Sequence, residues 1–197
     1  MSIYQFVPDN AVNHNHDFIT WDDAFSSEEL DRLVAYGDAM NLQDAVVSGS
    51  DSNILAIRRS KVGWVDHNPE SAWIYDRLAY VARKINGKFF KFDLYGFVEH
   101  MQYTVYTEDE TGHYTWHQDM SCEVECARKL SLILQLSDPA DYDGGDLEAW
   151  GQTEPTKVDK KRGMIAAIPS WRMHRVTPVT RGIRKTLVIW VAGPSFK

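Results

Sequence analysis

The stretch 129-KLSLILQL-136 decides the fold, because it is an apolar run of strand length that contains several branched side chains. Similar runs follow one another from residue 92 onward: FDLYGFVEHMQYTVY (92–106), GGDLEAW (144–150), GMIAAIP (163–169), HRVTPV (174–179) and KTLVIWVAG (185–193). Turn compositions separate them, such as DPADYDGG and TRG. Strands spaced by about ten residues predict an antiparallel barrel or sandwich.

The first 90 residues have a helical pattern instead. Ser26 and Glu29 have the spacing of a capping box at the start of an amphipathic segment. A second helix is predicted to begin near Pro69 and to end at Asn86-Gly87. Helices followed by strands predict helices packed outside the barrel.

The length of 197 residues fits one domain with a sizeable core. We expect a single domain over residues 1–197, helix-rich in 1–90 and with a catalytic β-core over about 90–197. The net charge of −7 argues against a nucleic-acid coat. No secretory signal and no stretch of ~18 apolar residues is present, so we expect a cytoplasmic protein without a membrane partner.

Residues in the second half have the spacing of a metal site. His117 and Asp119 form an H-x-D pair, and residues i and i+2 of a strand share a face, so both can reach one ion. Alone, such a pair is common in surface loops. His174 then has to come from a different strand. Two histidines and a carboxylate are the facial triad of non-haem Fe(II) oxygenases.

Arg184 stands just before the strand-like run LVIWV. An unpaired buried charge is costly, so this arginine needs a partner. The partner is either a protein carboxylate or the distal carboxylate of a co-substrate such as 2-oxoglutarate. Thr186 shares the face of Arg184 and offers a hydroxyl, while Trp190 on the same face could form a wall of the pocket.

Several ordered motifs resemble the Fe(II)- and 2-oxoglutarate-dependent dioxygenases of the prolyl 4-hydroxylase type: QYTVY, HYTWHQD, RKLSLILQLSDPADYDGGDLEAW and KRGMIAAIPSWRMHRVTPVTRGIRKTLVIWV. The pieces LSDPADYDGGDL and HRVTPVTRGIR are also similar to bacterial PKHD-type hydroxylases. The resemblance covers residues from about 102 to 191. It implies a mainly β fold with flanking helices, in which a double-stranded β-helix (jelly-roll) core has N-terminal helices packed outside.

The resemblance also implies roles for individual residues. His117, Asp119 and His174 would be the iron ligands, and Arg184 would bind the C5 carboxylate of 2-oxoglutarate. Collagen-type enzymes typically have lysine where Arg184 stands, whereas the bacterial and oxygen-sensing branches have arginine. The adjacent Lys185 is therefore the residue to test against it.

Two tyrosines of QYTVY compete for a further role. Tyr106 matches a tyrosine that often hydrogen-bonds the co-substrate in this family, and Tyr103 replaces it if the register slips. Either one could equally be a core residue. Trp116 flanks the triad and is expected to shape the entrance of the pocket.

The implied reaction is hydroxylation of an unactivated C–H bond with O2, releasing succinate and CO2, with ascorbate as a candidate reductant. The branch acts on prolyl residues, so we expect a protein or peptide substrate and a monomer or weak dimer. Segment 46–65 lies where such enzymes often have a mobile substrate loop. Arg58, Arg59 and Trp64 could grip a peptide there, although a surface loop followed by a strand on the barrel explains the segment equally well.

Other interpretations stay open at this point. The same chemistry could act on a free amino acid, another side chain or a nucleobase. A cupin-like binding module without turnover is a third class, which the intact triad and Arg184 argue against. Cys122 and Cys126 could join His113 and His117 in a zinc site, although this spacing does not match common zinc patterns. The two cysteines otherwise fit thiols in a reducing compartment.

Overall fold

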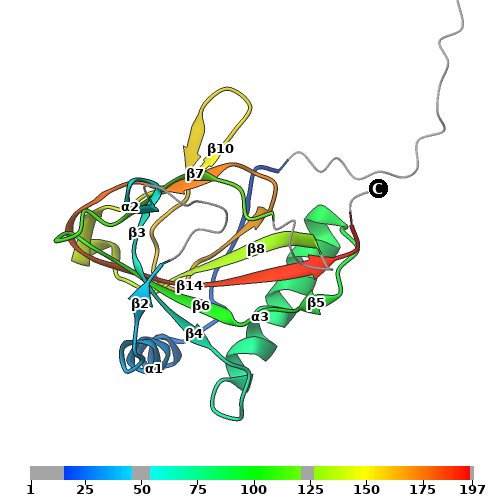
Figure 1. Ribbon diagram of the computed structural model, residues 1–197. Helices are drawn as coiled ribbons and strands as arrows, with labels where there is room; N and C mark the ends of the chain where they lie inside the picture. Colours follow the sequence, from blue (N-terminus) through cyan, green and yellow to red (C-terminus); the bar gives the residue numbers. More distant parts are fainter. Residues whose placement is uncertain (1–15, 46–53, 121–126, 196–197) are drawn as a thin grey trace, which may run out of the picture.

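The computed structural model describes residues 16–45, 54–120 and 127–195 (Figure 1). Its helices are α1 (Ser27–Asp38), α2 (Ile54–Ile57) and α3 (Ala72–Ile85), with a π-helical turn at Asn86–Phe90 and a 3-10 turn at Pro139–Asp141. Among these described residues, no helix is long and apolar enough to cross a membrane.

Two antiparallel sheets form the body of the molecule. In order across the larger sheet lie β1 (Ile19–Trp21), β12 (Ile165–Pro169), β8 (Ala127–Gln135), β14 (Val179–Gly193), β6 (Met101–Thr107), β4 (Lys61–Val65) and β2 (Gln43–Asp44), while β5 (Gly96–Phe97) and β9 (Tyr142–Gly144) pair with β14. The smaller sheet has the order β11 (Pro155–Lys157), β10 (Leu147–Trp150), β13 (His174–Val176), β7 (His113–His117) and β3 (Arg58–Arg59). This arrangement is the predicted double-stranded β-helix.

The larger sheet separates two apolar cores. On one side, Leu132 of β8 and Leu187 of β14 pack against Leu33 of α1 and Leu78 of α3. On the other side, Ile133 lies in a smaller cluster inside the barrel. Because side chains alternate along a strand, neighbouring residues of β8 and β14 belong to different cores.

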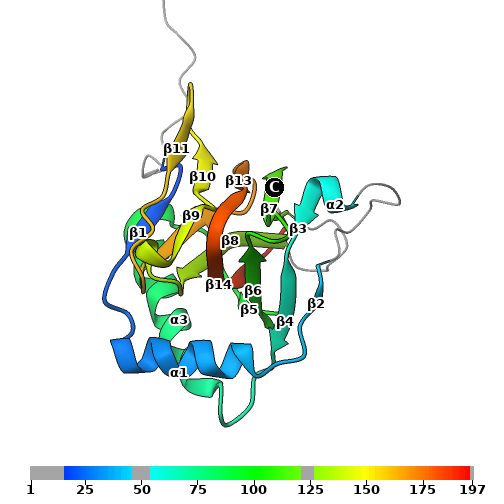
Figure 2. The same ribbon diagram turned by 90° about the vertical axis from the view of Figure 1, so that its left-hand side faces the viewer.

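Helices α1 and α3 cover one face of the larger sheet, so the predicted outer helices are confirmed (Figure 2). The capping box is present, since the Glu29 N–H donates to Ser26 Oγ over 3.3 Å and the Ser26 N–H donates to Glu29 Oε2 over 2.8 Å. The first 90 residues also contribute β1, β2 and β4 to the larger sheet. The helical part and the β-core therefore share one sheet.

Helix α3 begins later than the sequence suggests and ends at Ile85, next to the predicted Asn86-Gly87. It begins at Ala72, and the π-helical turn extends it beyond Asn86. Lys91 ends this turn with φ 56°. Asn86 is the C-cap of α3, and its side chain also bonds both backbone groups of Phe92, so it anchors the exit of the chain.

Candidate metal centre

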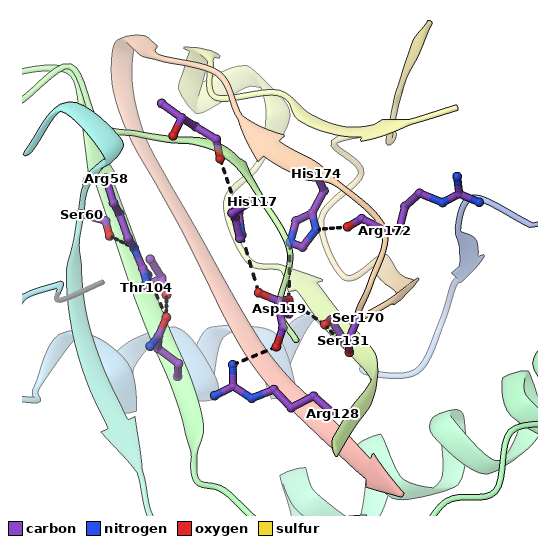
Figure 3. A network of polar contacts seen from close by, with 12 residues as sticks. Arg58, Ser60, Thr104, His117, Asp119, Arg128, Ser131, Ser170, Arg172 and His174 are labelled. Carbon is purple, nitrogen blue, oxygen red and sulfur yellow. Dashed lines mark hydrogen bonds and ion pairs between the residues drawn. The ribbon is translucent and has the colours of Figure 1, made fainter. Parts of the chain in front are cut away.

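His117, Asp119 and His174 come together inside the barrel, and one ligand atom from each lies within 4.8 Å of the others. His117 ends β7 and pairs with His174, the first residue of β13. Asp119 follows β7, and its backbone N–H donates to the Ser170 carbonyl over 2.9 Å. Figure 3 shows both imidazoles directed at the Asp119 carboxylate.

Hydrogen bonds on the far side of each ring fix the orientation of the imidazoles. Nδ1 of His117 lies 2.8 Å from the Thr115 carbonyl oxygen, and Nδ1 of His174 lies 3.0 Å from that of Arg172. A carbonyl can only accept, so each Nδ1 carries a proton. Both Nε2 atoms then face Asp119, at 3.6 Å for His117 and 3.4 Å for His174. Two Nε2 atoms and a carboxylate aimed at one point are a donor set for a divalent metal ion.

The electrostatics of the triad favour a bound cation. Burial, with help from His174, lowers the pKa of His117 to about 4, so its imidazole is neutral at pH 7. Burial disfavours ionisation of Asp119, but the two histidines and Ser131 outweigh it and hold its pKa well below the usual range. Burial also opposes protonation of His174, yet Asp119 raises its pKa. The site therefore favours positive charge beside Asp119, which a divalent ion supplies.

Arg184 is buried on the interior face of β14, at 1% exposure. Its Nη2 donates to Gln135 Oε1 over 3.2 Å, and its charge partly opposes the rise that burial causes in the pKa of Tyr142. Its Nε is buried with no partner. Within the described ranges no carboxylate pairs with Arg184, which argues against the protein ion-pair interpretation. A buried guanidinium in this state fits an anionic ligand.

Other predicted residues share this interior face. Thr186 and Trp190 are buried on the same side of β14 as Arg184, as alternation requires. The Trp190 Nε1–H is buried without a partner. Tyr106 belongs to the interior cluster, and Arg184 Cζ lies 5.3 Å from the centre of its ring.

Tyr103 lies on the opposite face of β6, three residues before Tyr106. Its ring packs among the residues beneath α1, and its hydroxyl donates to Asp38 Oδ1 over 2.7 Å. Burial raises its pKa further above the ordinary tyrosine value. Of the two tyrosines, only Tyr106 is near Arg184, so Tyr103 is removed from the candidate co-substrate site.

Two predicted residues lie away from the pocket. The pairing of β7 with β13 shifts in register between Tyr114 and His117, and the Trp116 ring makes an edge contact with Trp150 at 5.2 Å and lies 4.7 Å from Arg175 Cζ. Arg59 is exposed, and its Nε donates to the Leu55 carbonyl over 3.0 Å. The predicted roles of Trp116 and Arg59 at the pocket are not supported by these positions.

Arg58 and Trp64 have different surroundings from Arg59. Arg58 is 8% exposed and points toward Gln102 inside the barrel. Trp64 is 47% exposed, and its ring centre lies 6.3 Å from that of Trp190, at the rim of the interior. Residues 54–65 form α2, β3 and β4, whereas 46–53 of the predicted loop and both cysteines lie outside the described residues.

Several residues that surround the site were not indicated by the sequence motifs. Ser131 is fully buried on β8 and donates to Asp119 Oδ2 over 2.6 Å. Arg128 pairs with Glu99 and lies 3.9 Å from the centre of the Trp190 ring. Gln135 and Tyr142 hold Arg184. Ser131 and Gln135 are four residues apart on β8, so the sequence indicates that they share a face. Only the pairing of the strands shows that this face lines the candidate site.

A jelly-roll interior that holds two histidines, a carboxylate and an unpaired arginine defines the class of non-haem iron oxygenases. Residues 101–192 match the family model described as the 2OG-Fe(II) oxygenase superfamily. The matched residues include the triad and Arg184, and the match supports the predicted resemblance to this superfamily of oxidoreductases. The predicted cofactor pair, Fe(II) and 2-oxoglutarate, is the pair of this family.

Sequence relatives include bacterial PKHD-type hydroxylases. The chain is 40% identical over 85 residues to one from Synechococcus sp. (strain CC9311), covering 43% of this chain and 38% of that protein. It is 44% identical over 62 residues to the PKHD-type hydroxylase YbiX of Escherichia coli O157:H7, covering 32% and 27%. The matched stretch thus spans less than two fifths of the length of either relative.

Solved structures share the fold across nearly the whole chain. A prolyl-4-hydroxylase from Pseudomonas putida superposes with a TM-score of 0.72 at 20% identity, covering 91% of this chain and 94% of that one. A Trichoplax adhaerens prolyl hydroxylase, in complex with a hypoxia inducible factor peptide fragment, gives 0.74 at 16% identity, covering 92% and 85%. At these identities the likeness establishes the architecture alone.

Proposed function

We propose that this protein is an Fe(II)- and 2-oxoglutarate-dependent dioxygenase that hydroxylates a prolyl residue in a protein or peptide, with release of succinate and CO2. Arg184 is the observation that carries the proposal, because it is buried without a carboxylate partner in the interior that also holds the triad. The names of the PKHD-type and prolyl hydroxylase relatives support the choice of substrate.

Each residue has a distinct part in this proposal. His117, Asp119 and His174 hold the iron, and the bound iron and 2-oxoglutarate supply the oxidative chemistry. Arg184 takes the distal carboxylate of 2-oxoglutarate in a bidentate pair. Thr186 adds a hydroxyl from the same face.

Aromatic side chains complete the pocket. Tyr106 offers a second hydroxyl near Arg184, and Trp190 forms a buried wall on the same face of β14, in contact with Arg128. Trp64 is half-exposed beside Trp190 and offers a prolyl ring an apolar surface at the rim. These rings exclude water from the reacting C–H bond while leaving the rim open to a chain.

The test compares neighbouring residues that face opposite ways. Arg184→Ala removes a charge-assisted pair of ~2–3 kcal/mol, so 2-oxoglutarate should bind about 30- to 150-fold more weakly. Lys185→Ala removes only the ion pair with Asp38 of α1, at 2.6 Å, and should leave that affinity almost unchanged. Titration of the iron-loaded protein with 2-oxoglutarate measures both variants.

Succinate release with proline-containing peptides and with their alanine counterparts then tests the reaction itself, with His174→Ala as the inactive reference. Equal 2-oxoglutarate affinities of Arg184→Ala and Lys185→Ala would show that Arg184 does not anchor 2-oxoglutarate. Succinate release that ignores proline would point to another side chain, a free amino acid or a nucleobase. Absence of turnover with every substrate would favour the binding-module interpretation.

A further inference from the structure

Arg58, at the start of β3, is a second buried arginine without a counter-ion. It is 8% exposed, its Nε donates to Ser60 Oγ over 2.9 Å, and its Nη2 donates to Gln102 Oε1 over 2.8 Å. Both acceptors are neutral. In the parts of the chain that the structure describes, no carboxylate pairs with this guanidinium.

Six of the nine other arginines of this protein follow the opposite pattern. Six arginines with more exposed side chains each pair with a carboxylate: Arg77 with Glu29, Arg128 with Glu99, Arg162 with Asp31, Arg172 with Asp17, Arg175 with Glu148 and Arg181 with Asp143. Burial raises the need for a counter-ion, since it removes the hydration of the charge. Arg58 and Arg184 are the two arginines buried below a tenth, and neither has a counter-ion among the described residues.

One aromatic ring separates Arg58 from the metal site. Its Cζ lies 4.7 Å from the centre of the Tyr114 ring. That ring stacks on the His117 imidazole, with centres 3.5 Å apart and planes 10° apart. Figure 3 shows Arg58 across the interior from His117 and Asp119. Arg58 therefore lies beside the space in which a substrate meets the metal.

A count of charges, which rests on the proposed function, leaves Arg58 in excess. The charges of Fe(II) and Arg184 together balance those of Asp119 and the two carboxylates of 2-oxoglutarate. Nothing in that assembly neutralises Arg58. Among the described residues no carboxylate neutralises it, and an acidic substrate would bring an anion into the interior.

We propose that Arg58 binds a carboxylate of the substrate, so the substrate is an acidic peptide with Asp or Glu close to the hydroxylated residue. The planar guanidinium fits a carboxylate in a bidentate pair. Extended chain covers about 3.3–3.6 Å per residue, which places the acidic residue within about two positions of the reacting one. The protein has a net charge of −7, so a buried local cation is what would draw an acidic segment in.

The test uses capped hexapeptides with one central proline. A single Asp is moved along the positions around the proline, and each peptide has a twin with Asn in its place. Binding is measured by tryptophan fluorescence on anaerobic protein loaded with Fe(II) and 2-oxoglutarate. Wild-type protein should prefer one Asp peptide over its Asn twin by about 10- to 100-fold.

Three variants assign that preference to Arg58. Arg58→Gln should bind both twins within about twofold of each other, Arg58→Lys should keep part of the preference, and Arg59→Gln should keep all of it. If Arg58→Gln does not fold, the inference is tested by the preference of wild-type protein for the Asp peptide over its Asn twin and by the decrease of that preference in Arg58→Lys. Wild-type protein without any Asp preference, or Arg58→Gln with an undiminished one, overturns the inference.

The same samples separate this inference from the proposed function. 2-Oxoglutarate binding is measured before any peptide is added. Protein that fails to bind 2-oxoglutarate contradicts the proposed function. Protein that binds 2-oxoglutarate normally but has the same affinity for the Asp and Asn peptides contradicts only the role of Arg58.

Discussion

The two faces of the larger sheet are made by the same strands and have opposite chemistry. The face under α1 and α3 is apolar, with Leu132 and Leu187 fully buried against the helices. The interior face carries polar groups that are buried as deeply, including Ser131, Thr186 and Arg184. Stability and chemistry therefore belong to alternate residues of one strand, and substitutions at consecutive positions can separate them.

Leu187→Ala should have the largest effect on stability. It removes a side chain that is 1% exposed in the core beneath the helices. Truncation of a buried leucine costs about 2–5 kcal/mol of the free energy of unfolding, which denaturant titration measures. The folded fraction should bind 2-oxoglutarate as wild type does. A loss of affinity without a loss of stability would mean that the two faces are not independent.

Ser131→Ala should weaken the metal site. Its hydroxyl donates to Asp119 Oδ2 and orients that carboxylate. Loss of such an outer hydrogen bond typically lowers metal affinity by about 10- to 100-fold, which titration with Fe(II) under anaerobic conditions measures. Ser170→Ala is the control, because Ser170 reaches Asp119 with its side chain only through Ser131, at 3.2 Å. Equal losses for both serines would point to a general packing defect.

Thr186→Val should have the smallest effect, confined to the co-substrate. Valine keeps the shape of the residue and removes the hydroxyl from the interior face. One hydrogen bond contributes about 0.5–1.5 kcal/mol, so 2-oxoglutarate affinity should fall by about 2- to 13-fold. The midpoint of unfolding without ligand should change little, in contrast to Leu187→Ala one residue away. An unchanged affinity would show that Thr186 is only scaffold.

Local periodicity predicted much of this architecture. A period of two placed His117 with Asp119 and aligned Arg184, Thr186 and Trp190 on one face. The capping box at Ser26 marked the start of α1 correctly. These features depend on residues a few positions apart, which a sequence shows directly.

Other features depend on which strands become neighbours. The choice between Tyr103 and Tyr106 needs the register of β6 against β14, where Tyr106 is opposite Arg184. Ser131 reaches Asp119 because β8 passes beneath the end of β7, a contact between separate sheets. No local pattern distinguishes such a serine from one that is merely buried. The partnerless state of Arg58 likewise became visible only when its surroundings were known.

Strand β14 determines the spacing between residues on the interior face of the larger sheet. It runs without interruption from Val179 to Gly193 and carries Arg184 and Trp190 on one face, six residues apart. At about 3.3 Å per residue, that separation places the two residues about 20 Å apart along the strand. A substitution in β14 changes one side chain, whereas deletion of one residue would turn every later side chain of the strand to the opposite face. A change in the length of β14 therefore keeps these side chains on one face only when it adds or removes an even number of residues.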